Sequence, residues 1–328
     1  MKTLPRVKIA HLPTPVEVMP RLSSSLGGPK LLVKRDDQTG LAFGGNKTRK
    51  LEYLLAEAQA NGAQRLVTAG AIQSNHCRQT AAAAARQGFE CTLVLTLPSG
   101  YRDVPPQEDL PTGNLLLDHL FGAEIVWATH DQRDQLLKDT FQQAWESGAR
   151  PYLIPYGGSN TTGASAYAFA LQELLNQDVE TDWIVFPSSS GGTQAGLVLG
   201  ARLFGYSGQI LGISVDEHAD VLKERVAGLA TDTADILGEP TTFTAEDILV
   251  NADYLGGGYG VLGETEKEAV SLFALNEGLL LDPVYTGRAA AGLIDLISRG
   301  FFDRDQTVLF WHTGGTPALF ADRYRDLV

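Results

Sequence analysis

The sequence predicts an α/β protein with two domains, each built on an open, twisted and mostly parallel sheet covered by helices. From about Asn46 onward, short apolar segments alternate with amphipathic ones. Strands that are apolar throughout require helices on both faces of a parallel sheet. There are too many such segments for one small sheet, and 328 residues are enough to bury two cores.

Short apolar runs mark the strands that this fold requires. The predicted strands are Arg65–Thr68, Cys91–Thr96, Glu124–Trp127, Tyr152–Ile154, Trp183–Phe186, Ile210–Val215 and Thr307–Trp311. The stretch Ala227–Leu255 is acidic and lacks clear periodicity, so its secondary structure is the least well specified.

Helical periodicity fills the intervals between these strands. Apolar residues recur at i, i+3, i+4 and i+7 from Leu51 to Ala58, and Gly62 is a natural stop. The alanine-rich segment Asn75–Gln87 predicts a helix with Ser74 as its N-cap and Gly88 at its end. Further helices are predicted over Leu115–Leu120, Asp131–Ser147 and Ala166–Leu175, and from Gly192.

Composition excludes several classes of function. The formal net charge of −13 disfavours nucleic acid as a partner, because an acidic protein repels phosphate backbones. The first residues contain no apolar run typical of a signal peptide, and no segment is long and apolar enough for a membrane span. Cys77 and Cys91 alone provide neither a disulfide framework nor a metal site. We therefore expect a cytoplasmic protein without a bound metal.

A glycine-rich turn follows the strand that ends at Phe186. The sequence Pro-Ser-Ser-Ser-Gly-Gly-Thr-Gln-Ala-Gly then opens a helix, where backbone N–H groups and the helix N-terminus favour an anion. The hydroxyls of Ser188, Ser190 and Thr193 add further donors. The segment lacks the lysine of a P-loop and the glycine spacing of a dinucleotide fingerprint, so it suits a single phosphate. A plain tight turn between strand and helix explains the glycines equally well.

Lys47 follows a glycine pair in Gly44-Gly-Asn-Lys-Thr-Arg-Lys, at the opening of a predicted helix. The helix dipole is unfavourable to a cation there, which lowers the pKa of the lysine and favours its neutral amine. Schiff-base chemistry requires that neutral form. Considered alone, Lys47 is also compatible with a solvated lysine beside Arg49 and Lys50.

Polar residues gather at a second strand end, in Gly70-Ala-Ile-Gln-Ser-Asn-His-Cys. Ser74 and Asn75, with the exposed N–H groups of the next helix, form a plausible site for a carboxylate. N-capping by Ser74 is the simpler explanation of that residue, and His76 alone is typical of a structural hydrogen-bonder. Tyr259 and Tyr285 lie in tight glycine- and proline-containing loops, where packing is the commoner role of a tyrosine.

Taken together, these segments resemble one family of pyridoxal-phosphate enzymes, the D-cysteine desulfhydrase and 1-aminocyclopropane-1-carboxylate deaminase group. Its fold is of the tryptophan-synthase-β type, also known as fold type II. The resemblance extends in order through nearly the whole chain. The matching segments are Lys34-Arg-Asp-Asp, Gly44-Gly-Asn-Lys-Thr-Arg-Lys-Leu-Glu, Thr68-Ala-Gly-Ala-Ile-Gln-Ser-Asn-His, Gly157-Gly-Ser, Ser188–Gly196, Gly258-Tyr-Gly-Val, Leu281-Asp-Pro-Val-Tyr-Thr-Gly and His312-Thr-Gly-Gly-Thr-Pro-Ala.

The resemblance implies a role for each matching position. Lys47 would be the Schiff-base lysine that also moves the Cα proton, with Ser74, Tyr259 and Tyr285 as further catalytic residues. Ser74, Asn75 and His76 would bind the substrate carboxylate. The cofactor-binding residues it implies are Lys47, Asn75 at the ring hydroxyl, Ser190, Gly191, Gly192 and Thr193 at the phosphate, and Thr286 and Thr313 near the pyridine nitrogen.

The resemblance also implies how the chain divides. Lys47 and the phosphate loop are distant in sequence but must meet around one cofactor. We therefore expect a larger cofactor-binding domain formed by residues 1–47 and 155–328. A smaller domain, residues 48–154, would hold the substrate carboxylate, and we expect the protein to be a homodimer.

One departure from the family pattern bears on the reaction. In the deaminases, a glutamate that partners the pyridine nitrogen follows the Asp-Pro-Val-Tyr run, whereas this chain has Thr286. Without that carboxylate the ring is a weaker electron sink, which is adequate for β-elimination and poorer for opening a cyclopropane. The sequence therefore favours a lyase that converts a cysteine-like amino acid to pyruvate, ammonia and a sulfur species.

Three alternatives to this lyase remain at this stage. The chain could be a cyclopropane-carboxylate deaminase or an L-cysteate sulfo-lyase of the same family. It could also be a binder of small molecules without catalytic activity, although the presence of Lys47 argues against that.

Overall fold

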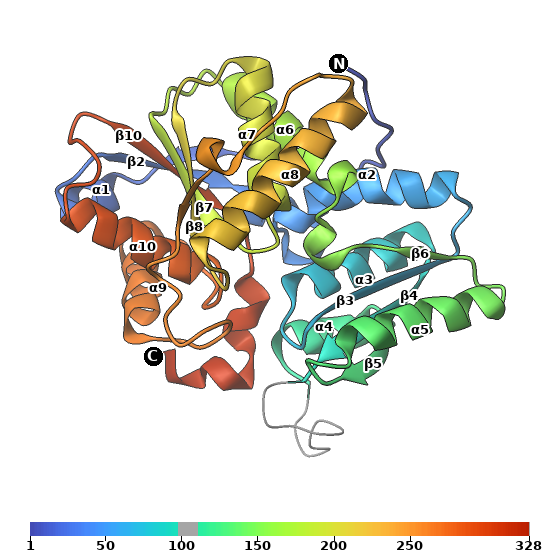
Figure 1. The fold of residues 1–328 in the computed structure, drawn as a ribbon. Coiled ribbons are helices and arrows are strands. Elements are labelled where there is room, and N and C mark those ends of the chain that lie inside the picture. The colour runs from blue at the N-terminus through green and yellow to red at the C-terminus, as the bar shows by residue number, and fades with distance from the viewer. Residues whose placement is uncertain (98–110, 328) are drawn as a thin grey trace.

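The computed structural model describes residues 1–97 and 111–327, which form two sheets (Figure 1). The order of the six-stranded sheet is β1 (Val16–Val18), β2 (Lys30–Arg35), β10 (Thr307–His312), β7 (Trp183–Ser188), β8 (Gln209–Ser214) and β9 (Leu249–Asn251). The order of the four-stranded sheet is β5 (Glu124–Ala128), β4 (Glu90–Thr96), β3 (Arg65–Ala71) and β6 (Pro151–Leu153). Every pairing is parallel except that of β1 with β2.

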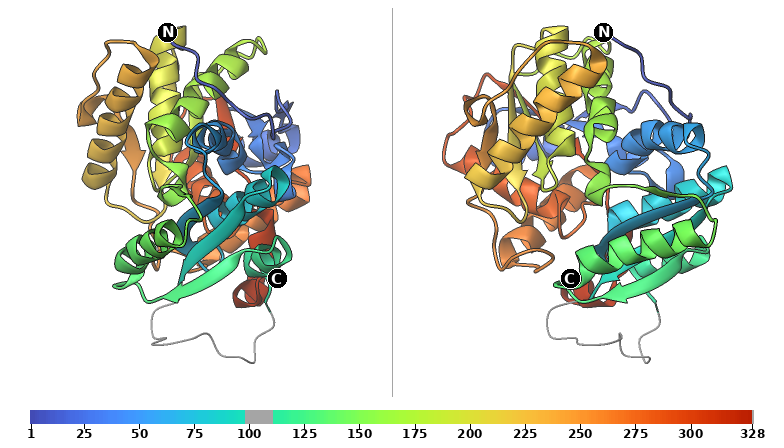
Figure 2. Two further views of the ribbon diagram at one scale, coloured as in Figure 1. Left: turned by 90° about the vertical axis from the view of Figure 1, so that its right-hand side faces the viewer. Right: turned by 45° about the vertical axis from the view of Figure 1, so that its right-hand side comes forward.

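Helices lie between most of the strands along the chain. They are α1 (Pro20–Leu26), α2 (Asn46–Ala60), α3 (Asn75–Gln87), α4 (Gly113–Leu120), α5 (Arg133–Glu146), α6 (Thr161–Leu175), α7 (Gly192–Phe204), α8 (Ala219–Leu237), α9 (Glu264–Glu277) and α10 (Thr286–Ser298). Figure 2 shows the same two sheet units from other sides, each with its own helices. The predicted α/β fold, with open and mostly parallel sheets of fold type II, is confirmed.

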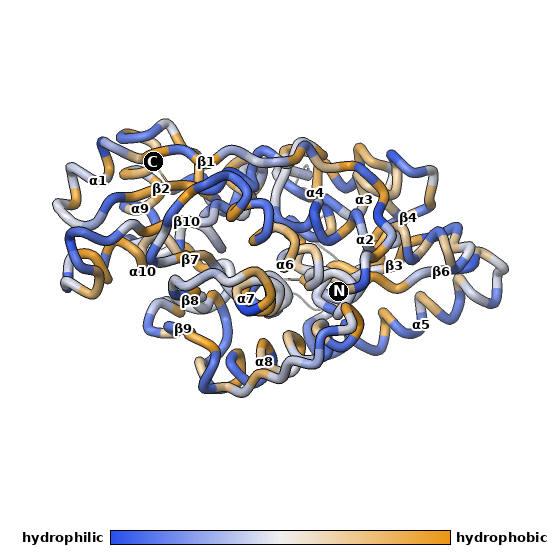
Figure 3. Tube along the Cα trace, turned by 90° about the horizontal axis from the view of Figure 1, so that it is seen from above, coloured by the Kyte–Doolittle hydropathy of each residue, from blue (hydrophilic) through white to orange (hydrophobic). Residues whose placement is uncertain are grey.

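The strands of the larger sheet alternate their side chains between two helical layers. In β10, Leu309 and Trp311 pack with α6, α7 and α8, whereas Val308 and Phe310 pack with α1, α9 and α10. This alternation is the two-residue period of a strand that is buried on both faces. Hydrophobic and hydrophilic positions alternate along α8 in Figure 3, as expected for a helix that covers a sheet.

The smaller sheet is covered in the same way. Leu66, Leu93 and Leu95 face one core, which also contains apolar side chains of α2 and α3. Ala69 and Val94 face a second, smaller cluster, against which α5 packs. Because α2 contributes to this core and also contacts α6 beside the larger sheet, it lies between the two sheet units.

The structure confirms most of the predicted elements, some with longer bounds. Ser74 caps α3 by accepting a hydrogen bond from the Cys77 amide, and Gly88 ends that helix in a left-handed conformation. The stretch Ala227–Leu255 contains the second half of α8, which the sequence analysis did not assign. The buried face of α8 starts with Leu222 and Val226, before that stretch, and continues mostly with small residues, so the stretch alone shows little periodicity.

The division into domains at residues 48 and 154 stays a prediction. The structure assigns β3, β4, β5 and β6, which lie between Arg65 and Leu153, to one sheet. All other strands of the described residues belong to the larger sheet. Sheet membership is therefore compatible with the predicted boundaries without fixing them.

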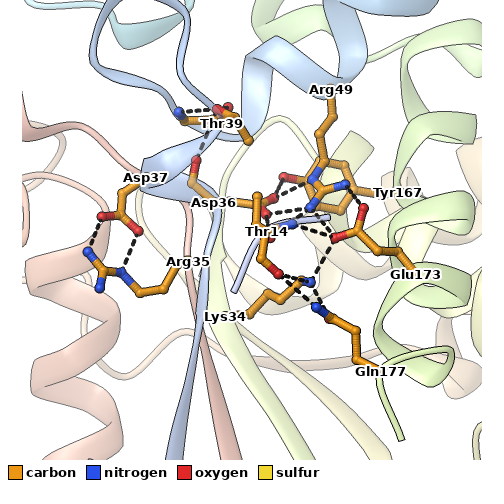
Figure 4. Close-up of polar contacts among 11 residues, drawn as sticks. Thr14, Lys34, Arg35, Asp36, Asp37, Thr39, Arg49, Tyr167, Glu173 and Gln177 are labelled. Carbon is orange, nitrogen blue, oxygen red and sulfur yellow. Dashed lines mark hydrogen bonds and ion pairs between the residues drawn. The ribbon is translucent and has the colours of Figure 1, made fainter. Parts of the chain in front are cut away.

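A buried ionic network fastens α2 to the larger sheet (Figure 4). Arg49 of α2 donates from Nε and Nη2 to the carboxylate of Asp36, which follows β2, over 2.9 and 2.8 Å. The hydroxyl of Tyr167 donates to the same carboxylate. Glu173 of α6 accepts hydrogen bonds from both Arg49 and Lys34 of β2. Burial alone would raise the pKa of Asp36, but pairing with Arg49 holds it below the usual value.

Breaking this network should destabilise the protein strongly. Arg49→Met would leave Asp36 buried without its cation, so we expect a loss of about 3–5 kcal/mol in the free energy of unfolding. Urea unfolding of the purified variant would measure it. The control is Arg299→Met, which removes an exposed ion pair with Asp295 and should leave the free energy of unfolding nearly unchanged. Similar losses in both variants would contradict the importance of the Asp36 network.

Candidate active site

A cleft of about 610 Å³, open to solvent, lies where the carboxyl ends of β3, β7 and β10 approach the start of α2. Clefts at strand carboxyl ends are the usual ligand sites of parallel α/β folds. Nine of the predicted site residues line it: Lys47, Ser74, Asn75, His76, Ser190, Gly191, Thr193, Tyr285 and Thr313. Gly192, Tyr259 and Thr286 are not among the lining residues, although each is adjacent in sequence or bonded to one that is.

The N-terminus of α2, which carries Lys47, is held from outside the helix. Its N-cap, Gly45, provides no side-chain cap, and Gln79 of α3 replaces it by accepting from the Thr48 amide over 2.8 Å. Gly44 and Gly45 have positive φ, and a Cβ on Gly44 would lie 2.0 Å from the carbonyl oxygen of Asp37. Glycine at position 44 is therefore required for this close backbone approach.

Two lysines project from the same face of α2, Lys47 half-buried and Lys50 fully buried. Burial lowers the pKa of Lys47 from 10.5 to about 8, so about a tenth of its amine is neutral at neutral pH, far more than for an ordinary lysine. Burial, with the neighbouring Lys47, holds the pKa of Lys50 well below its usual value. The Lys50 amine donates to the carbonyl oxygen of Gly157 and the hydroxyl of Ser159, each over 3.2 Å. The sequence analysis placed Lys47 correctly in the cleft but gave Lys50 no role.

The predicted phosphate loop faces these amines. The hydroxyls of Ser159 and Ser190 lie 2.8 Å apart, and the Gly192 amide donates to Ser159. A Cβ on Gly157 would lie 2.4 Å from the Ser190 hydroxyl and 3.5 Å from the Lys47 amine. The segment Gly157-Gly-Ser therefore closes the loop from the opposite side, and glycine leaves the space between Lys47 and Ser190 free.

The start of α7 has the features of an anion receptor. Its N-cap, Gly191, is left-handed and provides no side-chain cap, so the amides of Thr193 and Gln194 keep their donors. The Ser188 hydroxyl is buried and has no hydrogen-bond partner among the described residues. A phosphate bound here would satisfy such donors, which a plain turn would leave unused.

The start of α3 forms a second receptor across the cleft. Ser74 uses one lone pair of its hydroxyl to cap the Cys77 amide, which leaves its O–H free to donate. A Cβ on Gly70 would lie 2.6 Å from that hydroxyl, so only glycine allows the turn to be this tight. The amides of Asn75 and His76 are in the first turn and have no intrahelical acceptor. This is the geometry expected of a carboxylate site.

The ring of His76 is unsuited to donate to a carboxylate. Thr68 donates its hydroxyl proton to the Ile154 carbonyl, so it accepts from His76 Nε2, 2.9 Å away. His76 Nδ1 is then the unprotonated nitrogen, and it is buried without a partner. Burial holds the pKa of His76 well below its usual value, which keeps the ring neutral. Only the backbone amide of His76 can serve a substrate carboxylate as a donor.

Three tyrosines gather on the side of Tyr285. Its hydroxyl lies 2.6 Å from that of Tyr259, and the two rings meet edge to face. Burial raises the pKa of both phenols well above the usual value, so both stay protonated. Tyr156 also lines the cleft, and burial raises its pKa to about 12. The sequence analysis missed Tyr156, although it directly precedes the Gly157-Gly-Ser match.

The two predicted threonines differ in their surroundings. Thr313 follows β10, lines the cleft, and accepts the Asn46 amide through its carbonyl oxygen over 2.9 Å. The hydroxyl of Thr286 is fully buried, donates to Asp282 over 2.7 Å and accepts from the Asp282 amide. The hydroxyl of Thr286 therefore already has both a donor and an acceptor partner within the protein. Its role in binding the cofactor stays a prediction.

The lining as a whole fits pyridoxal phosphate. It combines a lysine whose amine is partly neutral, an uncapped helix N-terminus for a phosphate, and glycines that leave room beside Lys47. Across residues 1–97 and 111–327, no group of three or more histidine, cysteine, aspartate or glutamate side chains could hold a metal ion. No helix in that part of the chain is long and apolar enough to cross a membrane.

Comparisons with known proteins agree with this assignment. The family model described as pyridoxal-phosphate dependent enzyme matches residues 7–314. D-cysteine desulfhydrases from Salmonella choleraesuis (strain SC-B67) and Salmonella typhi are each 43% identical over 321 residues, which cover 97% of this chain and 96% of theirs.

Solved structures show the same relationship. The crystal structure of an ACC deaminase homologue is 34% identical, with a TM-score of 0.88, and covers 99% of this chain and 97% of its own. An L-serine ammonia-lyase from Rhizomucor miehei, with a TM-score of 0.68 and 15% identity over 97% and 99% of the two chains, shares the fold. The chain therefore belongs to the family of pyridoxal-phosphate dependent enzymes.

Proposed function

We propose that this enzyme is a β-eliminating lyase for a cysteine-like amino acid, with D-cysteine as the first choice. Its products would be pyruvate, ammonia and a sulfur species. The observation that carries the proposal is the position of the Lys47 amine between two anion receptors, the starts of α7 and α3. Relatives named D-cysteine desulfhydrase, 43% identical over 97% of the chain, support the choice of substrate.

Bound pyridoxal phosphate supplies an electron sink for the bond electrons released at Cα. Lys47 would hold the cofactor through its amine and would also be the base that accepts the Cα proton of the substrate. A lowered pKa suits both tasks, because the free amine can accept a proton near neutral pH. The Ser190–Thr193 loop would bind the phosphate group of the cofactor. The side-chain amide of Asn75 would donate to the hydroxyl group of its ring.

The start of α3 would fix the orientation of the substrate. The Ser74 hydroxyl and the amides of Asn75 and His76 can donate to its carboxylate. A carboxylate fixed at three donors turns one face of Cα toward Lys47, and such positioning accounts for much of the rate of an intramolecular step. The neutral ring of His76 would take no part in binding the carboxylate.

The tyrosine pair would serve the β-substituent. Tyr259 and Tyr285 are protonated and hydrogen-bonded to each other, so Tyr259 can hold the hydroxyl of Tyr285 in place. Because burial raises the pKa of both phenols, they are weak acids, suited to donate a hydrogen bond rather than a proton to the departing sulfur.

A deaminase acting on 1-aminocyclopropane-1-carboxylate is the second candidate, since an ACC deaminase homologue matches 99% of the chain. L-cysteate sulfo-lyase is a third, which differs only in the leaving group. We further propose a homodimer in the cytoplasm and the domain boundaries given above. Light scattering, cell fractionation and limited proteolysis would test these three points.

A substrate panel distinguishes the three reactions. We expect pyruvate from D-cysteine to form faster than from L-cysteine or L-cysteate, and faster than 2-oxobutyrate from 1-aminocyclopropane-1-carboxylate. Keto-acid assays on the purified enzyme would measure each rate. Fastest release of 2-oxobutyrate would instead establish the deaminase, and fastest turnover of L-cysteate would establish the sulfo-lyase.

Removal of either of these lysines of α2 should have a distinct effect. Lys47→Ala should abolish both turnover and the visible absorbance of the lysine-bound cofactor. Lys50→Met should keep that absorbance at saturating cofactor and weaken cofactor affinity about tenfold, because Lys50 supports the phosphate loop through Ser159. Absorbance titrations with pyridoxal phosphate would measure both effects. Retention of the absorbance in Lys47→Ala would reject the assignment of the lysine.

Attachment of the cofactor should depend on pH through Lys47. Attack on the aldehyde requires the neutral amine, so the rate of attachment to cofactor-free enzyme should rise with pH and level off above about 8. For an ordinary lysine the rise would continue towards 10.5. Stopped-flow absorbance at several pH values would follow it. A rate that still increases steeply at pH values well above 8 would show that Lys47 is not desolvated.

A further inference from the structure

We propose that Arg78 of α3 is a positioning residue that fixes the side-chain amide of Asn75 toward the cofactor and transmits its positive charge through that amide. This inference rests on the role proposed above for Asn75 at the ring hydroxyl. Arg78 is fully buried and does not line the cleft, so it would act through Asn75 rather than by contact with the cofactor.

The orientation of the Asn75 amide is fixed by two donors. Its Oδ1 accepts from Arg78 Nη1 over 2.8 Å and from Asn114 Nδ2 over 3.0 Å. A carbonyl oxygen has two lone pairs, so both are used and the oxygen is held away from the cleft. A reversed amide would place its NH₂ group against two donors. Asn75 Nδ2, which has no hydrogen bond among the described residues, is therefore the atom that the amide offers to the cleft.

Asn114, at the start of α4, completes this arrangement. Its Oδ1 accepts from Arg78 Nη1 over 2.7 Å, and its Nδ2 also donates to the Gln73 carbonyl over 2.9 Å. The Asn114 amide in turn donates to the side chain of Gln73. Rotation of Asn75 would break the two buried hydrogen bonds to its Oδ1, and each broken bond costs the desolvation of its group.

Arg78 also fixes Asn75 relative to Lys47. Its Nη2 donates to the carbonyl oxygen of Gly44 over 2.9 Å, in the loop that leads into α2. The next residue, Gln79, caps α2 at Thr48. Two adjacent residues of α3 thus hold both the amide at the ring hydroxyl and the helix that carries the lysine.

The charge of Arg78 is not neutralised by contact with a carboxylate in the described part of the chain. Its bonded acceptors are three neutral oxygens, those of Asn75, Asn114 and Gly44. Burial lowers its pKa to about 10, so it stays charged at neutral pH. Asp118 is fully buried, both its oxygens lack partners, and burial raises its pKa well above the usual value, which favours its neutral form.

The other titratable groups around the cofactor are few. Lys47 and Lys50 come from α2, neutral His76 from α3, and the protonated Tyr156 and Tyr285 from neighbouring loops. Two carboxylates belong to neighbouring turns: the oxygens of Asp282, before α10, accept from the amides of the turn that follows it, and Asp216 accepts from the hydroxyl of Ser189, which lines the cleft. A positive charge behind Asn75 therefore favours loss of a proton from the lysine-bound cofactor. Removal of the Arg78 charge should favour retention of that proton.

The experiment compares two Arg→Met changes on the same sheet unit. In Arg78→Met, the pH at which the visible absorbance of the cofactor titrates should rise by about one unit, and cofactor should dissociate about tenfold faster. The control is Arg65→Met at the opposite end of β3, where Arg65 pairs with Glu90 and Glu124. Arg65→Met removes the same charge and should leave the pH titration of the cofactor absorbance unchanged. An unshifted titration in Arg78→Met would overturn the proposal.

Two further variants separate positioning from a general loss of structure. In an Asn75→Ala background, Arg78→Met should shift the titration by less than half as much. An equal shift there would overturn the action through Asn75. If Arg78→Met does not fold, Arg78→Lys is the alternative variant, because it keeps the charge but cannot donate to both Asn75 and Gly44. An unchanged rate of cofactor dissociation in Arg78→Lys would overturn the positioning role. These readouts need no substrate, so they stand even if D-cysteine is not turned over.

Discussion

The ion pair between Arg49 and Asp36 is the contact on which the site depends, because it fastens the helix that carries Lys47. Arg49 lies two residues after Lys47, and Asp36 lies at the end of the second strand of the larger sheet. Glu173 and Lys34 join the pair and balance its charges, so the network is neutral as a whole (Figure 4). A buried group of this kind adds little stability over an apolar core but strongly resists rearrangement. It therefore fixes where the start of α2 lies.

The cleft shows the opposite arrangement, in which the cations lack anionic partners. Lys50 and Arg78 are buried and Lys47 is half-buried, and none of them contacts a carboxylate in the described residues, in a chain whose net charge is −13. Burial lowers the pKa of all three. A phosphate at the start of α7 would favour the charged form of a nearby amine and so offset part of that effect at Lys50.

Local sequence patterns were sufficient for the parts of the site that lie within one strand–helix turn. Ser74 as a cap and the glycine loop before α7 could be predicted because their partners are neighbours in sequence. The contacts that complete the site could not, since they join distant segments: Gln79 caps α2, and Lys50 reaches Ser159. The pattern also gave no orientation for the ring of His76, which is set by Thr68 of β3 and by Ile154, the residue after β6.

The surroundings of Thr286 show why the ring nitrogen would lack a carboxylate partner in this enzyme. The backbone and hydroxyl of Thr286 both donate to Asp282, whose other oxygen accepts from the amides of Val284 and Tyr285. Asp282 therefore holds the first turn of α10. A glutamate at 286 would place a second carboxylate beside it in a buried position, where like charges raise each other's pKa. A threonine keeps the turn intact and leaves a weaker electron sink, which suffices when a good leaving group departs from Cβ.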